Sequence, residues 1–246
     1  MSHAPLPLAG TFHEFSVAVD DVRGAVEYYE RLGFSQATTT DTFTHPYGVL
    51  TDGRLFIGLH QRGGPSPTLT FVRPGIAASL AAFAAAGIHL SRCRTGDEVF
   101  NEIAFSDPFG QQVAVLEART YSPVARDAME VSLCGDFAEV SLPAGDFSAA
   151  QAFWEPLGFV AAEEAEKPYP HLTLTSDHLD LAFHVPAVCA RPMLVFRAAD
   201  MGARLERLRT LGFAPGPAPP PMRADAGSAL LDAPGGTALL LLEAMD

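Results

Sequence analysis

Two long segments of this chain, residues 12–34 and 137–159, repeat each other at a constant offset of 125 residues. Each carries a glutamate at the same place, Glu14 in the first and Glu139 in the second. The match continues through the rest of each copy with slips of one residue. A unit of this length is too long for a solenoid repeat and close to the usual size of a domain. We therefore predict two tandem domains at 10–118 and 136–245, joined by a linker at 119–135.

Hydrophobic periodicity predicts the same order of elements four times: a strand, a helix and three further strands, or βαβββ. In the first unit a strand at 12–19 precedes a helix at 22–32, which stops at Gly33. A glycine just after the last helical residue is a common stop signal. The next helix, at 76–86, ends at Gly87 in the same way.

Composition limits the classes of partner. The 246 residues have a hydrophobic fraction of 48% and a formal net charge of -13. An acidic chain is a poor match for nucleic acid, because affinity for phosphates comes largely from lysine and arginine. The sequence has no long apolar run and no leader pattern, so we expect a cytoplasmic protein without a membrane partner. Its three cysteines have no metal-type spacing, and we interpret them as isolated thiols.

The opening pattern at 19–34, its repeat at 146–159 and the closing Asp-Pro-x-Gly turn at 107–110 resemble the vicinal oxygen chelate superfamily. That superfamily includes glyoxalase I, bleomycin-resistance proteins and extradiol dioxygenases. The resemblance covers nearly the whole chain, twice. It implies an α+β fold: four βαβββ modules in two tandem glyoxalase-like domains, with mixed sheets curled into cups and helices outside.

Metal-dependent members of that superfamily place ligands at four matched points on the strands of each cup. The resemblance carries the first point to Glu14 and Glu139. The other points fall on residues without a ligating side chain: Gly58, Pro67 and Ala114 in the first copy, and Ala182, Pro192 and Leu240 in the second. A transition-metal site needs about three protein ligands. We therefore expect no metal ligands and no cofactor, with a divalent metal disfavoured.

Strand alternation assigns the residues that should line the cups. If Glu14 points inward, Phe12 should as well, and on the fifth strand Leu69 and Phe71 should. The candidate ligand-binding residues are Ser16, His45, Tyr47, Phe56, His60, Phe71, Phe100, Asn101 and Gln112 in the first copy, and Ser141, His171, Asp180, His184 and Phe196 in the second. Of these, His45, Tyr47 and His171 lie at the lips of the cups, and Phe100 and Asn101 on the penultimate strand. The cations near predicted rims that could pair with an anionic ligand are Arg54, Arg73, Arg197 and Arg223, but we favour their interpretation as solvated surface arginines.

The two glutamates are the candidate catalytic residues. A glutamate buried in an apolar cup should have a raised pKa and could act as a base or as a hydrogen-bond donor. A purely structural role, with hydrogen bonds to backbone or arginine, explains both residues equally well. His60 and His184 likewise allow a structural interpretation.

These features favour a metal-independent protein that binds a small, largely apolar or planar molecule, as a monomer or homodimer. The alternative is a lyase, isomerase or dioxygenase acting on a small oxygenated metabolite. In that case Glu14 or Glu139 would be the base or a lone metal ligand, and His60 or His184 would polarise an oxygen. One copy could also bind while the other only supports it. A proline cluster at 215–221 predicts a stiff loop, which either covers the second cup or merely connects two elements.

Overall fold

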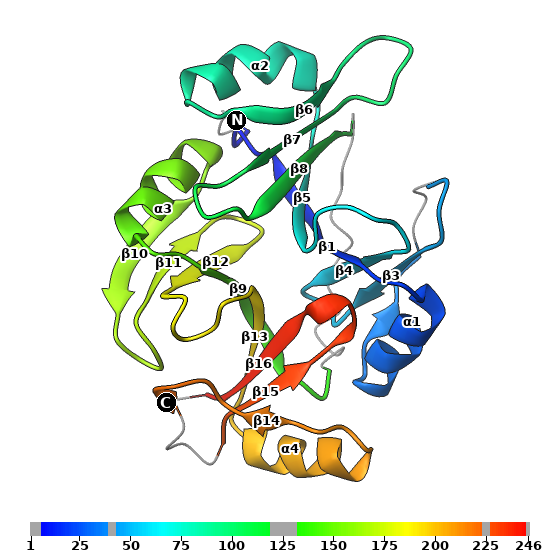
Figure 1. The fold of residues 1–246 in the computed structure, drawn as a ribbon, viewed down its shortest axis with the longest axis vertical. Coiled ribbons are helices and arrows are strands. Elements are labelled where there is room, and N and C mark those ends of the chain that lie inside the picture. Colours follow the sequence, from blue (N-terminus) through cyan, green and yellow to red (C-terminus); the bar gives the residue numbers. More distant parts are fainter. Residues whose placement is uncertain (1–5, 39–42, 119–131, 223–226, 245–246) are drawn as a thin grey trace, which may run out of the picture.

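A computed structural model of the chain describes residues 6–38, 43–118, 132–222 and 227–244 (Figure 1). Four βαβββ modules follow one another, as the duplication predicts. The first two consist of β1 (Thr11–Ala18), α1 (Val22–Arg31), β2 (Ser35–Gln36), β3 (Tyr47–Thr51) and β4 (Phe56–His60), then β5 (Thr68–Arg73), α2 (Ile76–Ala85), β6 (Leu90–Arg94), β7 (Glu102–Ser106) and β8 (Gln112–Glu117).

The last two modules repeat this order with small 3-10 turns added. They consist of β9 (Asp136–Pro143), α3 (Phe147–Trp154), η1 (Glu155–Leu157), β10 (Val160–Ala165), β11 (His171–Thr175) and β12 (Asp180–His184), then β13 (Met193–Ala198), α4 (Met201–Thr210), β14 (Gly216–Pro217), β15 (Ala229–Asp232), η3 (Pro234–Gly236) and β16 (Ala238–Glu243). β14 has only two residues, because the prolines around it lack the backbone N–H that a longer ladder needs.

Each pair of modules shares one mixed eight-stranded sheet. The strand orders are β2-β3-β4-β1-β5-β8-β7-β6 and β10-β11-β12-β9-β13-β16-β15-β14, so the two sheets have the same topology. The helical turns of all four modules are followed by a glycine with positive φ: Gly33, Gly87, Gly158 and Gly212. This left-handed conformation ends a helix at little cost only when no Cβ is present.

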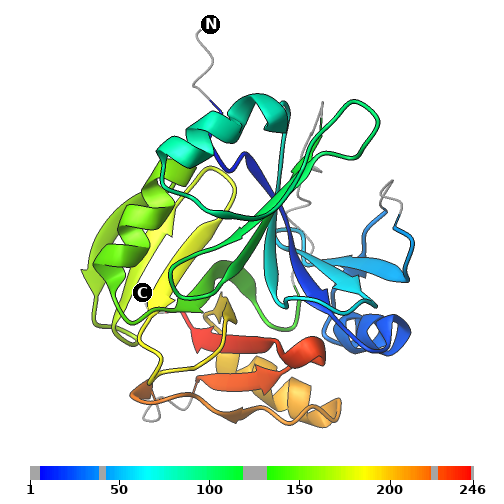
Figure 2. The ribbon, with the colours of Figure 1, turned by 45° about the horizontal axis from the view of Figure 1, so that its top comes forward.

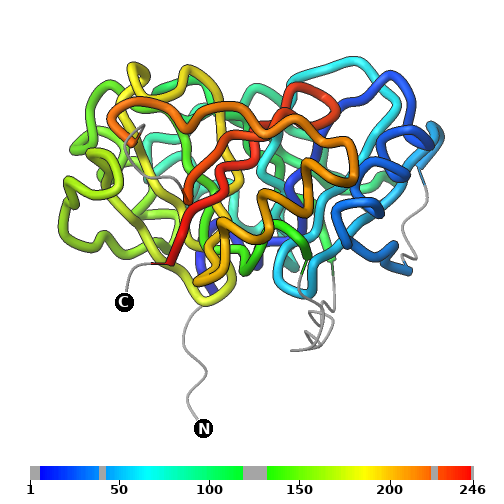
Figure 3. Tube along the Cα trace, turned by 90° about the horizontal axis from the view of Figure 1, so that it is seen from below, coloured from blue at the N-terminus to red at the C-terminus, as the bar shows by residue number. Residues whose placement is uncertain are grey.

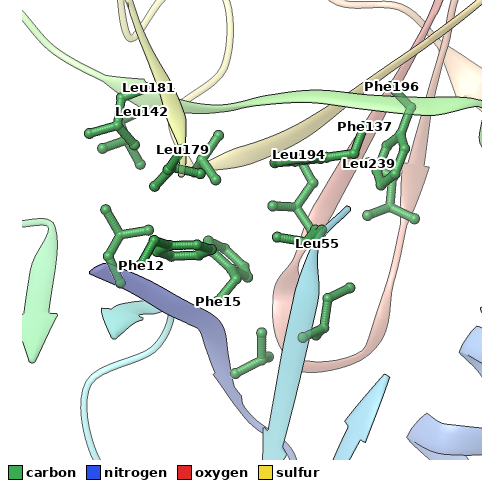
Figure 4. Packing of buried hydrophobic residues seen from close by; sticks show 14 of the residues in the cluster. Phe12, Phe15, Leu55, Phe137, Leu142, Leu179, Leu181, Leu194, Phe196 and Leu239 are labelled. Carbon is green, nitrogen blue, oxygen red and sulfur yellow. The ribbon is translucent and has the colours of Figure 1, made fainter. Parts of the chain in front are cut away.

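The two domains share one hydrophobic core. Figure 4 shows Phe12, Phe15 and Leu55 of the first domain facing Leu179, Leu194 and other apolar residues of the second. Figures 1 and 2 show α3 beside α2 and α1 beside α4, so helices of different domains cover this core together. Phe105 of β7 contacts Phe153 of α3, with 6.2 Å between the ring centroids. The apolar faces of both sheets are therefore turned toward the other domain.

The closing turn of each domain contacts the opposite domain. The Trp154 indole donates a hydrogen bond of 3.4 Å to the carboxylate of Asp107 in the first closing turn. The second closing turn, red in Figure 3, lies against the blue first strand, where a Cβ on Gly235 would be 2.6 Å from the Ala18 carbonyl oxygen. Only glycine allows that approach, so the matched turns also join the domains.

A bulge on the first strand of each domain corrects the predicted cup lining. In β1 the register with β5 shifts between Phe12 and Glu14, so Phe12 pairs with Phe71 while Glu14 pairs with Thr70. Phe71 belongs to the core between the domains, on the face opposite Glu14. The same shift in the second domain pairs Glu139 with Val195 and moves Phe196, with Leu194, to the core face. The predictions that Phe12, Leu69, Phe71 and Phe196 line the cups were wrong, because an extra residue inverts strand parity.

Candidate binding site in the first cup

We call the face of the first sheet that carries Glu14 the first cup, and the face of the second sheet that carries Glu139 the second cup. The Glu14 side chain is only 3% exposed. It accepts hydrogen bonds from Ser16 and Tyr47, both at 2.6 Å, and is 3.0 Å from Nε2 of His60. Ser16 is also 2.7 Å from the hydroxyl of Thr70. Neighbouring strands thus supply donors to one buried carboxylate.

These donors decide the charge of Glu14. Burial alone would raise its pKa, but the hydrogen bonds from His60 and Ser16 and the positive potential of His60 and His13 hold the pKa below its ordinary value. The expected increase in pKa is therefore wrong for Glu14. Its carboxyl is ionised at neutral pH, and both oxygens are engaged within the protein.

Glycine at position 58 provides the space for this arrangement. Gly58 lies beside Ser16 on the neighbouring strand, and a Cβ there would be 2.3 Å from the carboxyl carbon and both oxygens of Glu14. The matched residue of the second domain is Ala182, which is fully buried. The first cup can hold its glutamate in this position because the side chain at 58 is missing.

An aromatic wall stands beside the carboxylate. Nε2 of His45 is 3.0 Å from Nδ1 of His60, which continues the series from Glu14 toward the lip. Tyr47 stacks near His60 with ring centroids 4.5 Å apart, and Phe43 packs on Tyr47 at 4.6 Å. Burial, His60 and Arg62 all lower the pKa of His45, so its ring is neutral at neutral pH. The predicted residues His45, Tyr47 and His60 come together with Glu14 and Ser16.

A cavity of about 190 Å³ lies on the same sheet face, over β5, β8, β7 and β6. Its lining contains small and polar side chains and two cations: Arg62, Thr68, Ser91, Arg92, Ala104, Gln112 and Ala114. Thr70, next to Glu14, is paired with Ala114 across β5 and β8. The cavity is therefore one strand away from the carboxylate, and Arg62, which lines it, is near enough to His45 to lower the pKa of that ring.

The second cup is filled by its own side chains. Met193, Val195, Ala238 and Leu240 line its face, and these residues are fully buried. Residues of two loops complete this cluster: Val188 and Cys189 before β13, and Ala218 and Met222 in the proline-rich segment. The segment thus covers the second cup, which was one of the two interpretations of the proline cluster. The matched positions in the first cup are Thr68, Thr70, Gln112 and Ala114, which form no such cluster.

Glu139 differs from Glu14 in its partners. Among the described residues, its Oε1 is buried without a hydrogen-bond partner, and its Oε2 has one long contact of 3.5 Å, from Thr173. Burial raises the pKa of Glu139, helped by Asp180 and opposed by Arg197 and His171. The expected increase in pKa therefore applies to this glutamate alone.

The histidine of the second cup belongs to a separate chain of hydrogen bonds. Tyr169 donates to Ser141 at 3.3 Å, Ser141 is 2.7 Å from Nδ1 of His184, and Nε2 of His184 is 2.9 Å from the carbonyl oxygen of Cys189. Because a carbonyl only accepts, Nε2 carries the proton and Nδ1 accepts from Ser141. Burial lowers the pKa of His184 to about 4, so the ring is neutral.

The remaining predicted residues lie apart from Glu14. Phe100 is 57% exposed in the turn before β7, and Asn101 donates to Glu117 at 2.7 Å. Both border another hollow, next to the start of α2. Gln112 lines the first cavity, and Phe56 lies at the start of β4.

In the second domain, Asp180 accepts from Thr175 at 2.5 Å and His171 contacts the Tyr169 carbonyl oxygen at 2.7 Å. Of the rim arginines, Arg223 lies outside the described residues. Arg73 donates to the Leu8 carbonyl oxygen at 2.6 Å. Asp180, His171 and Arg73 are thus engaged within the protein, and none of them lines the first cavity.

Sequence reasoning missed Thr70, Phe43, Arg62 and Arg92. The alternation of threonine with apolar residues in β5 was a usable signal for Thr70, because polar residues favour the face away from a shared core. Arg92 follows a register shift in β6, and Arg62 lies in a loop, so no periodicity indicated either one.

Comparisons with known proteins agree on the fold. The 2,3-dioxygenase LapB from Pseudomonas sp. KL28 superposes with a TM-score of 0.63 at 14% identity, covering 99% of this chain and 94% of that one. A catechol 2,3-dioxygenase gives 0.57 at 16% identity, covering 95% and 87%. The Mn(II)-bound glyoxalase from Novosphingobium aromaticivorans gives 0.58 at 14%, covering 96% and 82%. No protein-family model and no curated protein matches the sequence. The chain has the vicinal oxygen chelate fold in two tandem domains.

The donor set does not fit the metal centre that the vicinal oxygen chelate fold often carries. Thr70 and Ala114 lie beside Glu14 across β5 and β8, and Gly58 lies under its carboxylate. Thr70, rather than the predicted Pro67, is the fifth-strand neighbour. No group of three or more His, Cys, Asp or Glu side chains in the described part of the chain is placed to hold a metal ion. Both Glu14 oxygens already accept hydrogen bonds, so a metal there would displace internal donors.

No helix within the described ranges is long and apolar enough to cross a membrane.

Proposed function

We propose that this chain is a small-molecule-binding protein of the vicinal oxygen chelate type, that its first cup holds the ligand, and that it works without a resident metal. The observation that carries the proposal is the difference between the two cups. The first contains a cavity of about 190 Å³ beside an ordered polar network, whereas apolar side chains of the second domain fill the second. A concave site with a few fixed polar groups is typical of small-molecule binding.

Glu14 has a positioning role in this proposal. Because its oxygens are engaged by Ser16, Tyr47 and His60, it fixes the donors of the aromatic wall rather than touching the ligand itself. A planar ligand over Ala104 and Ala114 would lie on the same face of the sheet as that wall, with β1 and β5 between the two. The second domain then supports the first through the shared core.

An enzyme is the second candidate, and one observation favours it. His45, His60 and Glu14 form a hydrogen-bonded series from the half-buried lip to an ionised carboxylate. Such a series can take up a proton at His45 and spread the charge inward. The solved structures of similar fold include dioxygenases and a glyoxalase, so the reaction would be a lyase, isomerase or dioxygenase reaction. If His45→Gln abolishes turnover of a compound that the protein still binds, this candidate replaces simple binding.

A ligand screen by thermal shift tests the leading proposal. A ligand that binds only the folded protein raises Tm by mass action. Ala114→Leu introduces into the first cup the leucine that occupies the matched position 240 of the second cup, so it should cancel every ligand-induced shift. Ala81→Leu, on the exposed face of α2, is the matched control and should leave the shifts intact. Shifts that survive Ala114→Leu would place the ligand elsewhere and refute the proposal.

Metal analysis tests the second part of the proposal. The purified full chain, dialysed against a chelator, should contain far less than one equivalent of Ni, Zn, Fe or Mn and keep its ligand-induced shifts. A stoichiometric metal that resists dialysis would overturn metal independence, and the loss of binding on its removal would assign the metal to the site.

A further inference from the structure

We infer that the ligand of the first cup is a planar organic carboxylate, held by Arg62 and Arg92 on two sides of the cavity. This inference rests on the proposed function, because it names the chemical class of the ligand for the same site. Arg62 lies in the loop that joins β4 to β5, and Arg92 lies on the edge strand β6. Both side chains line the cavity, whose floor is formed by β5, β8 and β7.

The neutral polar groups of the lining are already in use as donors. The Ser91 hydroxyl donates to the Ala104 carbonyl oxygen at 3.1 Å, and the Thr68 hydroxyl donates to the Pro65 carbonyl oxygen at 3.2 Å. The Gln112 amide donates to Ser106 and to the Gly110 carbonyl oxygen. The side-chain donors of this described lining that remain for a ligand therefore come from the two guanidinium groups.

The arginines are only weakly neutralised by the protein. Arg62 has no hydrogen bond or ion pair within the described part of the chain. Arg92 has one ion pair, a long contact of 3.6 Å to Glu102, and its side chain is 63% exposed. Exposed pairs of this kind contribute little free energy, so an incoming anion can compete with Glu102. In a chain of net charge -13, two such cations at one cavity make a local attraction for an anion.

The shape of the cavity favours a flat molecule. Its floor includes Ala104 and Ala114, which face each other across β7 and β8 and leave the space above them open. A cavity of about 150 Å³ can hold benzene. The cavity of about 190 Å³ therefore has room for a single ring with one carboxylate substituent. A guanidinium group binds a carboxylate through two parallel hydrogen bonds, which also fixes the orientation of the ring.

The test compares benzoate with benzamide, which have nearly the same shape and differ in charge. Binding to the full chain is measured by calorimetry at low ionic strength. We expect benzoate to bind about tenfold more tightly than benzamide, about 1.4 kcal/mol. Arg62→Gln and Arg92→Gln should each remove most of that preference. Arg23→Gln removes the same charge from an exposed, ion-paired site on α1 and should change nothing. Added salt should weaken benzoate binding and leave benzamide binding unchanged.

The outcomes separate this inference from the proposed function. Equal binding of benzoate and benzamide, or a preference that survives both arginine variants, overturns the carboxylate inference. If the thermal-shift screen also finds neutral ligands that Ala114→Leu excludes, the proposed binding function stands without the carboxylate inference. If benzoate binds but Ala114→Leu has no effect, the anion lies outside the first cup and both are refuted.

Discussion

Replacing Gly58 by alanine should break the hydrogen-bond network of the first cup. The new Cβ would lie 2.3 Å from the carboxyl carbon and both oxygens of Glu14, whereas ordinary contacts begin at 3.4 Å. The carboxylate must therefore move by about 1 Å or rotate away, and its bonds of 2.6 Å from Ser16 and Tyr47 cannot both survive. A lost hydrogen bond to a buried charge costs about 1.5–3 kcal/mol, so the loss of one or both bonds costs about 1.5–6 kcal/mol.

The assay is thermal unfolding followed by circular dichroism at neutral pH. For a chain of this size each kcal/mol lowers Tm by about 2–4 °C, which predicts a decrease of roughly 10 °C. Gly63→Ala is the matched control, because nothing lies within 4 Å of a Cβ there. Its Tm should stay close to that of the parent protein.

A double-mutant cycle isolates the cause. In a Glu14→Ala background the carboxylate is absent, and Gly58→Ala should cost less than about 1 kcal/mol. If the alanine at position 58 costs the same in both backgrounds, the clash with Glu14 is not the reason for the glycine, and the reasoning fails.

Four further predictions follow from burial, charge and the shared core. Glu14 has a lowered pKa in the fold, so its stabilising contribution is present above its unfolded pKa of 4.5 and is lost as pH falls through the folded pKa. Glu14→Gln should therefore lower the free energy of unfolding by about 2–3 kcal/mol at neutral pH and flatten the acid side of a plot of Tm against pH. Glu139 has a raised pKa in the fold, so the stability of the protein falls as pH rises from the unfolded to the folded pKa of this residue. Glu139→Gln should therefore raise Tm at neutral pH and leave it unchanged in acid. A lower Tm at neutral pH would contradict the raised pKa. Cys93 is exposed, whereas burial raises the pKa of Cys134 to about 12, so a thiol reagent should label the first rapidly and the second only on unfolding. The isolated segment 1–118 should bind a hydrophobic dye and aggregate, because it exposes its half of the shared core; a soluble monomer with native circular dichroism would contradict the role of that core.

The sequence was sufficient to predict the modules, because the periodicity and the glycine stops are local signals that recur four times. It was also sufficient to bring Tyr47, Ser16 and His60 to Glu14, since these three residues lie on strand segments whose alternation is undisturbed; His45 comes just before β3. The charge of the two glutamates was not predictable. Their pKa values move in opposite directions because of donors on neighbouring strands, which only the register brings together.

The face of β5 was assigned incorrectly for a physical reason. We expected the apolar residues Leu69 and Phe71 to line an apolar cup, but the largest apolar surface of each sheet is buried against the other domain. That surface takes the aromatic side chains, and Thr70 is left for the cup. The alternation of threonine with apolar residues in β5 was the signal for this arrangement, whereas no periodicity indicated the position of Arg62 in a loop.

The proline-rich segment fills the second cup with a side chain of the protein itself, which competes with any ligand for that space. Met222 is 3% exposed in the cluster that fills this cup, and full burial of such a side chain contributes about 1.5–3 kcal/mol. A foreign molecule must displace it, which weakens apparent affinity by roughly 10–100-fold. An engineer who wishes to open a second, independent compartment in this scaffold should therefore begin with Met222→Ala, and leave the strands of the cup as they are.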